Sequence, residues 1–345
     1  MNHLREMFAL APAQNDHRVA IRCGIGIGVP LAVVLAIGRI DLAIFVAFGA
    51  FTSIYGRNEP HRQRLGHQAR AGALMFAVIL AGALSSRLGL DAWGVVLGTT
   101  AVAGLGTVAT GYWRLRPAGS LFHIFAYAAI ASVPAHPPLW QGMLAAGSAI
   151  VFAVLLGLSG MLHARYRTPW NKPLRPRFSP AKQKAIWADG GLYAVAAAAA
   201  GSVATLLGIG HNYWAMVAAT VPLAGATFRH RIQRGVSRML GTFGGLGITA
   251  VILFARPQPW QLVLVIALLQ FGAELFIARN YALAQVVITP LALLSTELSH
   301  AGSPTTLIQD RAIETVIGAL VGMALVLLLQ LRASRAGARG ARIPA

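Results

Sequence analysis

The segment Arg165–Lys184, RYRTPWNKPLRPRFSPAKQK, divides the chain into two apolar parts of similar length. It contains seven lysines and arginines and no acidic residue. Pro169, Pro173, Pro176 and Pro180 exclude a regular helix through most of it, because proline lacks the N–H that a helix needs. The segment is therefore predicted to be a cytoplasmic linker between two membrane-embedded halves.

The composition excludes an ordinary soluble domain. Of the 345 residues, 56% are hydrophobic and 11% are charged, whereas about a quarter are charged in a typical soluble protein. The net charge of +19 is also typical of nucleic-acid binding. However, the cations lie in short loops between apolar spans, which is the pattern of the positive-inside rule. The expected partner is therefore the lipid bilayer and not a nucleic acid.

The apolar runs predict an all-α integral membrane protein, because a membrane-spanning helix needs about 20 such residues. About twelve transmembrane helices are expected. They lie near Val19–Ile37, Leu42–Tyr55, Ala71–Leu84, Trp93–Tyr112, Ala118–Val133, Leu139–Leu162, Gly190–Leu207, Tyr213–Thr227, Met239–Phe254, Trp260–Phe276, Tyr281–Leu294 and Ala312–Leu331.

The cations are divided unequally between alternate loops. One set of loops, which includes the predicted loop Arg229–Arg238, holds 25 of the 29 lysines and arginines. The other set holds only Arg39, Arg87, Arg256 and Arg311. The positive-inside rule places the first set, and with it both termini, in the cytoplasm.

The two halves resemble each other. GRIDLAIFVAFGAFTSIYGR from Gly38 and GIGHNYWAMVAATVPLAGATFR from Gly208 both contain a polar turn, a short apolar span and an arginine-rich loop. Each half has an even number of spans, so the repeats are predicted to be parallel. The expected domains are a six-helix repeat over 1–163, a linker over 164–186, a second six-helix repeat over 187–332 and a tail over 333–345.

Small residues indicate where helices touch. Gly24–Gly28, Gly241–Gly245 and Gly318–Gly322 are Gly-x-x-x-Gly pairs, which allow close helix packing in lipid. The spans Leu42–Tyr55 and Tyr213–Thr227 are short, and short spans at matched positions of two halves indicate a transport site. The alternative is that the bilayer thins around them.

Ionisable residues in apolar spans are the candidates for proton coupling. Asp41 and His211 begin the two short spans at matched positions and are predicted to approach each other, although both could instead cap their helices. Glu274, near the end of its span, is a third candidate. Glu314 lies three residues after Arg311, and a local surface pair accounts for it.

Arginines and neighbouring aromatic residues are the candidates for substrate binding, since a guanidinium pairs with a carboxylate and an aromatic wall stacks on a ring. An interfacial aromatic belt is the alternative for the aromatic residues. The candidate substrate-binding residues are Arg22, Arg57, Arg114, Arg279, Trp214 and Tyr281.

The chain carries no H-E-x-x-H, G-x-S-x-G, Walker A or paired C-x-x-C motif. No enzyme activity, metal site or cofactor is therefore expected. Both a monomer and a homo-oligomer are compatible with the sequence.

Three segments resemble the fusaric acid resistance, or aromatic acid exporter, family of bacterial inner-membrane proteins. They are DLAIFVAFGAFTSIYGRNEPHRQR from Asp41, HNYWAMVAATVPLAGATFRHRIQRGVSRMLGTFGG from His211 and ELFIARNYALAQVVITPLALL from Glu274. The resemblance implies a multi-pass inner-membrane exporter of aromatic carboxylic acids or similar amphipathic compounds. Many family members carry a large cytoplasmic domain after each helical half, and the corresponding regions here are short.

The predicted function is secondary transport that exports aromatic or other organic anions and is coupled to protons. A passive organic-anion channel and a membrane scaffold that transports nothing are the alternatives. Transport that follows only the electrochemical gradient of the substrate would distinguish the channel from the coupled transporter.

Overall fold

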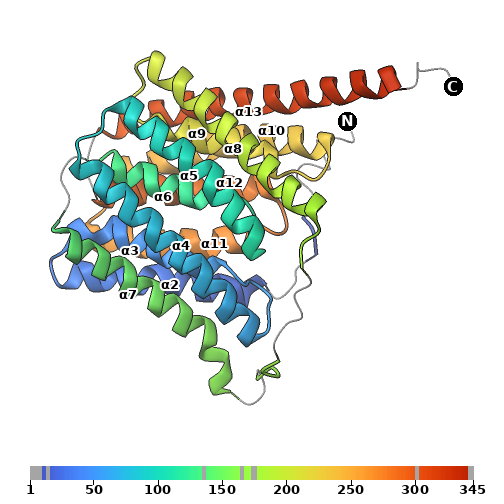
Figure 1. Ribbon diagram of the computed structural model, residues 1–345. Helices are drawn as coiled ribbons and strands as arrows, with labels where there is room; N and C mark the ends of the chain where they lie inside the picture. Colours follow the sequence, from blue (N-terminus) through green and yellow to red (C-terminus); the bar gives the residue numbers. More distant parts are fainter. Residues whose placement is uncertain are drawn as a thin grey trace.

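The computed structural model describes residues 10–12, 16–133, 137–163, 167–171, 177–299 and 303–340. These residues form twelve α-helices with short 3₁₀ turns, and no strand is present among them (Figure 1). The helices are α2 (Asp16–Ala36), α3 (Ala43–Ala50), α4 (His61–Arg87), α5 (Ala92–Trp113), α6 (Leu121–Ala131), α7 (Leu139–Leu158), α8 (Pro180–Leu206), α9 (Tyr213–Thr220), α10 (Phe228–Phe254), α11 (Pro259–Phe276), α12 (Tyr281–Ser299) and α13 (Pro304–Gly340).

The predicted all-helical membrane class is confirmed. Nine helices of the described chain are long and apolar enough to cross a membrane, and three shorter apolar segments run over Ile40–Ile54, Leu121–Ala131 and Tyr213–Ala224. Each predicted span overlaps one of these twelve segments. The two predicted short spans are indeed short, since α3 and α9 have 8 residues each.

Four helices, α4, α8, α10 and α13, begin well before the predicted spans. In α10 the hydroxyl of Thr227 accepts a hydrogen bond from the His230 N–H at 3.2 Å, which caps the helix start within the predicted basic loop. In α8 the hydroxyl of Ser179 does the same for the Lys182 N–H at 3.3 Å. Polar first turns are therefore helical, although hydropathy assigns them to loops.

Because these helices begin earlier than predicted, two arginines lie inside the protein and not in loops. Arg238, predicted in a cytoplasmic loop, lies inside α10, and Arg311, predicted in an outer loop, lies inside α13. α13 is long, and its C-terminal end projects beyond the rest of the bundle (Figure 1). In the predicted linker, the described residues 167–171 and 177–179 are not helical, and its residues 164–166 and 172–176 lie outside the described residues.

The short helices follow the same turn in both halves. Gly38 ends α2 with φ +69°, and Gly208 ends α8 with φ +70°. The N–H of the next residue bonds to a carbonyl five residues earlier in each case, Arg39 to Val34 and Ile209 to Ala204. This is the Schellman arrangement, which favours glycine at the left-handed position. The chain then enters α3 or α9.

Every residue of α3 and of α9 is buried. Short helices flanked by irregular backbone are tolerated at membrane depth when protein, not lipid, surrounds them. Burial therefore removes the need for a thinned bilayer around these two segments.

The packing of the first half (α2–α7) has counterparts in the second half (α8–α13). α4 packs on α6 as α10 packs on α12, and α3 packs on α7 as α9 packs on α13. The halves meet through α2 with α11 and α5 with α8. A Cβ on Gly24 would lie 3.1 Å from the Ala267 carbonyl oxygen, and one on Gly190 would lie 3.0 Å from the Gly104 carbonyl oxygen.

The three Gly-x-x-x-Gly pairs lie at helix contacts, as predicted. The closest contact is that of α13 with α9, where a Cβ on Gly318 would lie 2.2 Å from the Ala215 carbonyl oxygen and one on Gly322 would lie 2.3 Å from that of Ala219. Backbone atoms cannot move aside as a flexible side chain can. These glycines therefore set the distance between α13 and α9.

We expect Gly318→Ala to lower the thermal unfolding temperature of the purified protein, because overpacking a tight contact costs about 1–3 kcal/mol. Gly247→Ala is the matched control, since no atom lies within 4 Å of a Cβ at that position. Alanine is a better helix former than glycine, so the control should be neutral or stabilising. Equal unfolding temperatures for the two variants would contradict the close contact.

Candidate functional site

A concentration of buried polar groups lies where α9, α10, α12 and α13 meet. Arg311 and Glu314 of α13 are 1% and 0% exposed, and Arg238 of α10 is 3% exposed. Arg311 and Glu314 are three residues apart, which places them on one face of α13. We call Arg238, Gln285, Arg311, Glu314 and Trp214 the central cluster.

Arg311 stacks on an aromatic ring. Its guanidinium carbon lies 3.9 Å from the centroid of the Trp214 ring, within the range of a cation–π interaction. Its Nε and Nη1 atoms have no hydrogen-bond partner among the described residues. A buried guanidinium normally has its N–H groups paired, so these donors are available to an anion.

Glu314 is similarly placed. Neither of its carboxyl oxygens has a hydrogen-bond partner within the described chain. The predicted local surface pair with Arg311 is therefore wrong, because both side chains are buried. The early start of α13 at Pro304 places them two turns or more inside the helix.

Arg238 extends the cluster toward the start of α10. Its Nη1 atom donates to Gln285 Oε1 on α12, and Tyr281 lies beside it. One turn earlier on α10, the guanidinium carbon of Arg234 lies 4.2 Å from the centroid of the Tyr281 ring. Arg234, Arg238 and Arg311 thus form a row from the start of α10 to α13. Glu314 is the acidic residue of the central cluster.

Aromatic rings from both halves cover the cluster. The ring centroids of Phe125 on α6 and Trp214 on α9 are 4.5 Å apart, and those of Tyr213 and Trp214 are 5.0 Å apart. Beside Tyr213 lies a pocket of about 320 Å³, which His211 and Leu307 also line. Leu307 is one helical turn before Arg311, so the pocket approaches the central cluster along α13.

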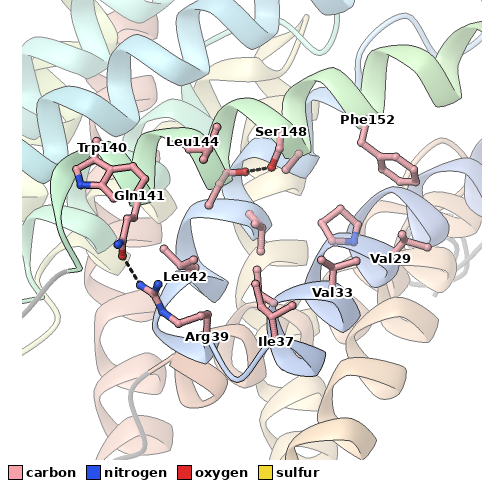
Figure 2. Close-up of a pocket in the computed structure, with 15 residues that line it drawn as sticks. Val29, Val33, Ile37, Arg39, Leu42, Trp140, Gln141, Leu144, Ser148 and Phe152 are labelled. Carbon is pink, nitrogen blue, oxygen red and sulfur yellow. Dashed lines mark hydrogen bonds between the residues drawn. The ribbon is translucent and has the colours of Figure 1, made fainter.

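A larger hollow of about 450 Å³ lies elsewhere, between α2, the start of α3 and α7 (Figure 2). Its wall is mainly apolar and includes Val29, Val33 and Leu144. At one end, Arg39 donates to Gln141 Oε1 at 2.5 Å (Figure 2). Arg39 also donates to both carboxylate oxygens of Asp41. The one guanidinium of this hollow is therefore already paired.

Of the residues predicted to bind substrate, Trp214 belongs to the central cluster and Tyr281 lies next to it. Arg22 and Arg57 meet Glu274 in a second group. Arg57 forms ion pairs with Glu274 at 2.5 Å and Asp16 at 2.8 Å, and Arg22 Nη2 donates to the Arg57 carbonyl oxygen at 3.5 Å. We call these four residues the Arg57 group.

The Arg57 group connects α2, the segment before α4, and α11, so it joins the two halves. Its two guanidinium groups and two carboxylates sum to zero charge. Because Arg57 already has two carboxylate partners, the geometry favours a structural role for it. The central cluster, in contrast, has more cations than anions.

Asp41 and His211 do not contact each other in the described chain. Asp41 pairs with Arg39, whereas the His211 Nδ1 atom lies 2.7 Å from Asp310 Oδ2. Neither short helix has a side-chain capping hydrogen bond at its start, and Asn212 donates instead to the Thr205 hydroxyl at 2.9 Å. The capping alternative is therefore also not observed.

Arg114 and Arg279 follow α5 and α11, which are matched helices of the two halves. The guanidinium carbon of Arg114 lies 4.3 Å from the centroid of the Phe178 ring, and Arg279 Nε donates to the Ala11 carbonyl oxygen at 2.9 Å. Both lie beyond helix ends, and neither is a member of the central cluster. Their predicted role in substrate binding stays a prediction.

The sequence interpretation missed Arg238, Arg311 and Glu314 as site residues. A signal was present: Arg231, Arg234 and Arg238 follow the spacing of one helix face. Ser303 followed by Pro304 is likewise a helix-start signal, and the Ser303 hydroxyl accepts a hydrogen bond from the Thr306 N–H at 3.5 Å. Either signal places charges inside helices.

Residues 197–325 match a family model described as fusaric acid resistance protein-like. This match covers α9 to α12 and much of α13, including every residue of the central cluster. The predicted resemblance to the fusaric acid resistance family is thus confirmed over these residues.

The uncharacterized membrane protein YvaC of Bacillus subtilis (strain 168) is 32% identical to this chain over 143 residues. The matched region is 41% of this chain and 23% of that relative. No solved structure matches the chain. Among the described residues, no group of three His, Cys, Asp or Glu side chains is placed to hold a metal ion.

We expect Arg57→Leu to lower the thermal unfolding temperature strongly, because Glu274 would then be a buried carboxylate without its cation. Breaking one partner of a buried ion pair costs about 3–5 kcal/mol. The double variant Arg57→Leu/Glu274→Leu should recover part of the loss. Arg62→Leu is the control, since Arg62 donates only to the Trp170 carbonyl oxygen among the hydrogen bonds described. A double variant less stable than Arg57→Leu would contradict the pairing.

Proposed function

We propose that this protein is a secondary transporter of organic anions, with aromatic carboxylates as the preferred class, and that Arg311 is the principal anion-binding residue. The observation that carries the proposal is the buried guanidinium of Arg311, stacked on Trp214 with two nitrogen atoms that have no partner among the described residues. Ionisable groups at membrane depth are costly and usually mark substrate or ion pathways.

The chemistry of the cluster fits this substrate class. A guanidinium presents paired N–H donors that match the two oxygens of a carboxylate. Phe125, Tyr213 and Trp214 offer aromatic surface beside it. A molecule with an acidic group on an aromatic ring would therefore satisfy both parts of the cluster.

The proposed path runs through the second of two parallel six-helix repeats, with Phe125 of the first repeat beside it. The matched helix packing and the matched turns at Gly38 and Gly208 support the repeats. The path would run from the pocket beside His211, past Trp214 and Arg311, to Arg238 and Arg234. Arg234 is near the start of α10, where the positive-inside rule places the cytoplasm.

We further propose that the protein lies in the bacterial inner membrane with both termini in the cytoplasm, that it exports its substrate and that transport is coupled to protons. The unequal division of cations and the family match of the second half support this assignment. A passive anion channel is the second candidate, and the row Arg234, Arg238 and Arg311 favours it, because rings or rows of cations line anion pores. On either proposal the chain acts as a carrier or pore and not as an enzyme.

The test is anion flux in proteoliposomes, with benzenesulfonate, benzoate and aliphatic carboxylates as probes, with and without a pH gradient. Arg311→Lys keeps the charge but loses the planar fork, so we expect flux of aromatic anions to fall about tenfold or more, as for a lost charged hydrogen bond. Arg256→Lys, at an exposed position after α10, is the matched control. Normal flux in Arg311→Lys would remove Arg311 from the binding site.

The orientation is tested separately with single cysteines in a Cys23→Ser background. Lys182→Cys near the start of α8 and Thr305→Cys near the start of α13 are both exposed positions. An impermeant thiol reagent added to intact cells should label Thr305→Cys and leave Lys182→Cys unlabelled until the membrane is opened. The reverse pattern would invert the topology.

A further inference from the structure

Anion binding by Arg311 leaves the neighbouring Glu314 without a role. It is a fully buried carboxyl group whose two oxygens have no hydrogen-bond partner among the described residues. Its neighbour Thr315 is also fully buried, with a hydroxyl that lacks a partner in the same part of the chain. A carboxylate removed from water without hydrogen bonds is unstable as an anion unless a cation compensates it.

We propose that Glu314 is a proton-binding site that competes, when ionised, with the transported anion for Arg311. With a proton on Glu314, the Arg311 guanidinium is available to the substrate anion. Without the proton, the Glu314 carboxylate is the internal counter-ion of Arg311 and repels the substrate. This inference rests on the proposed function, because it assigns a second residue to the same site.

The charged and titratable groups around Glu314 favour this competition. Arg311 and Asp310 on α13 are its electrostatic neighbours, and Tyr213 on α9 faces the same three residues. Arg311 in turn has Arg238 on α10 and Tyr281 on α12 as neighbours.

Asp310 is already paired with His211, and residues 194–206 of α8, which also packs on α13, include no titratable side chain. Arg311 is therefore the cation that Glu314 and an incoming anion share.

The sign of the coupling follows from this arrangement. A proton on Glu314 strengthens anion binding, and by reciprocity a bound anion strengthens proton binding by the same factor. Coupling of this kind is typically about 5- to 150-fold. Proton and anion are thus bound together and cross together. The protein is a symporter in this respect, so export is driven by the outward gradient of the anion and not by an inward proton gradient. The proton then needs no separate entry site at Asp41 and His211.

The first test needs no transported substrate. Infrared difference spectra of the purified full chain, recorded between acidic and alkaline pH, should show the C=O band of a protonated carboxyl group in the wild type. Other carboxyl groups of the chain also absorb in this region, so the Glu314 component is the C=O intensity that is lost in Glu314→Gln and kept in Glu59→Gln, which changes a carboxylate paired with His67 near the start of α4. Equal C=O intensity in Glu314→Gln and the wild type would overturn the proposal.

The second test uses benzenesulfonate, which stays ionised and cannot itself carry a proton. Adding it at alkaline pH should increase the protonated Glu314 band, and no increase would overturn the coupling.

In wild-type proteoliposomes an outward benzenesulfonate gradient should carry protons outward, whereas in Glu314→Gln the anion should move without protons. Protons that move against the anion would overturn the proposal. A band that responds to benzenesulfonate without any flux would instead refute the transport function and leave the shared site standing.

Discussion

The interaction on which the site depends is the stacking of the Arg311 guanidinium on Trp214. A cation at membrane depth is costly, and snorkelling to the membrane surface is not open to a side chain that faces the bundle interior. The protein holds it with an indole ring on one face and with neighbouring carboxyl and phenol groups around it. This arrangement requires α9 to lie directly against α13, because Trp214 belongs to one helix and Arg311 to the other.

The close approach of these helices comes from glycine and alanine. Gly318 and Gly322 on α13 face Ala215 and Ala219 on α9 at distances that leave no room for a Cβ on the glycines. Arg311 is two turns before Gly318 on the same helix. The same small-residue contact that holds α9 inside the bundle therefore also fixes the distance between the indole and the guanidinium. One helix pair therefore determines both this packing and the geometry of the proposed binding site.

The sequence predicted the helices better than it predicted the site. The twelve apolar segments, the two short spans and the Gly-x-x-x-Gly contacts follow from hydropathy and residue size, which the bilayer constrains directly. The starts of α4, α8, α10 and α13 cannot be predicted from hydropathy, because a polar turn of a helix has the composition of a loop. Arg238 and Arg311 were misplaced for this reason. Arg57 and Glu274 were predicted as separate candidates for substrate binding and proton coupling. Their ion pair was not predicted, since no sequence pattern shows that residues 217 positions apart form one.

The two halves match in packing but not in charge, and this difference bears on mechanism. Where α2 meets α11, the contact holds the Arg57 group, whereas the matched contact of α5 with α8 places Gly111 against Ile186. The central cluster likewise draws its charged residues from α10 and α13 of the second half alone. In a symmetric dimer of six-helix subunits, each buried arginine would have a symmetry-related copy in the other subunit. A single chain that contains both halves can change one without the other. On the proposed mechanism, one Arg311 beside one Glu314 would then bind one anion together with one proton.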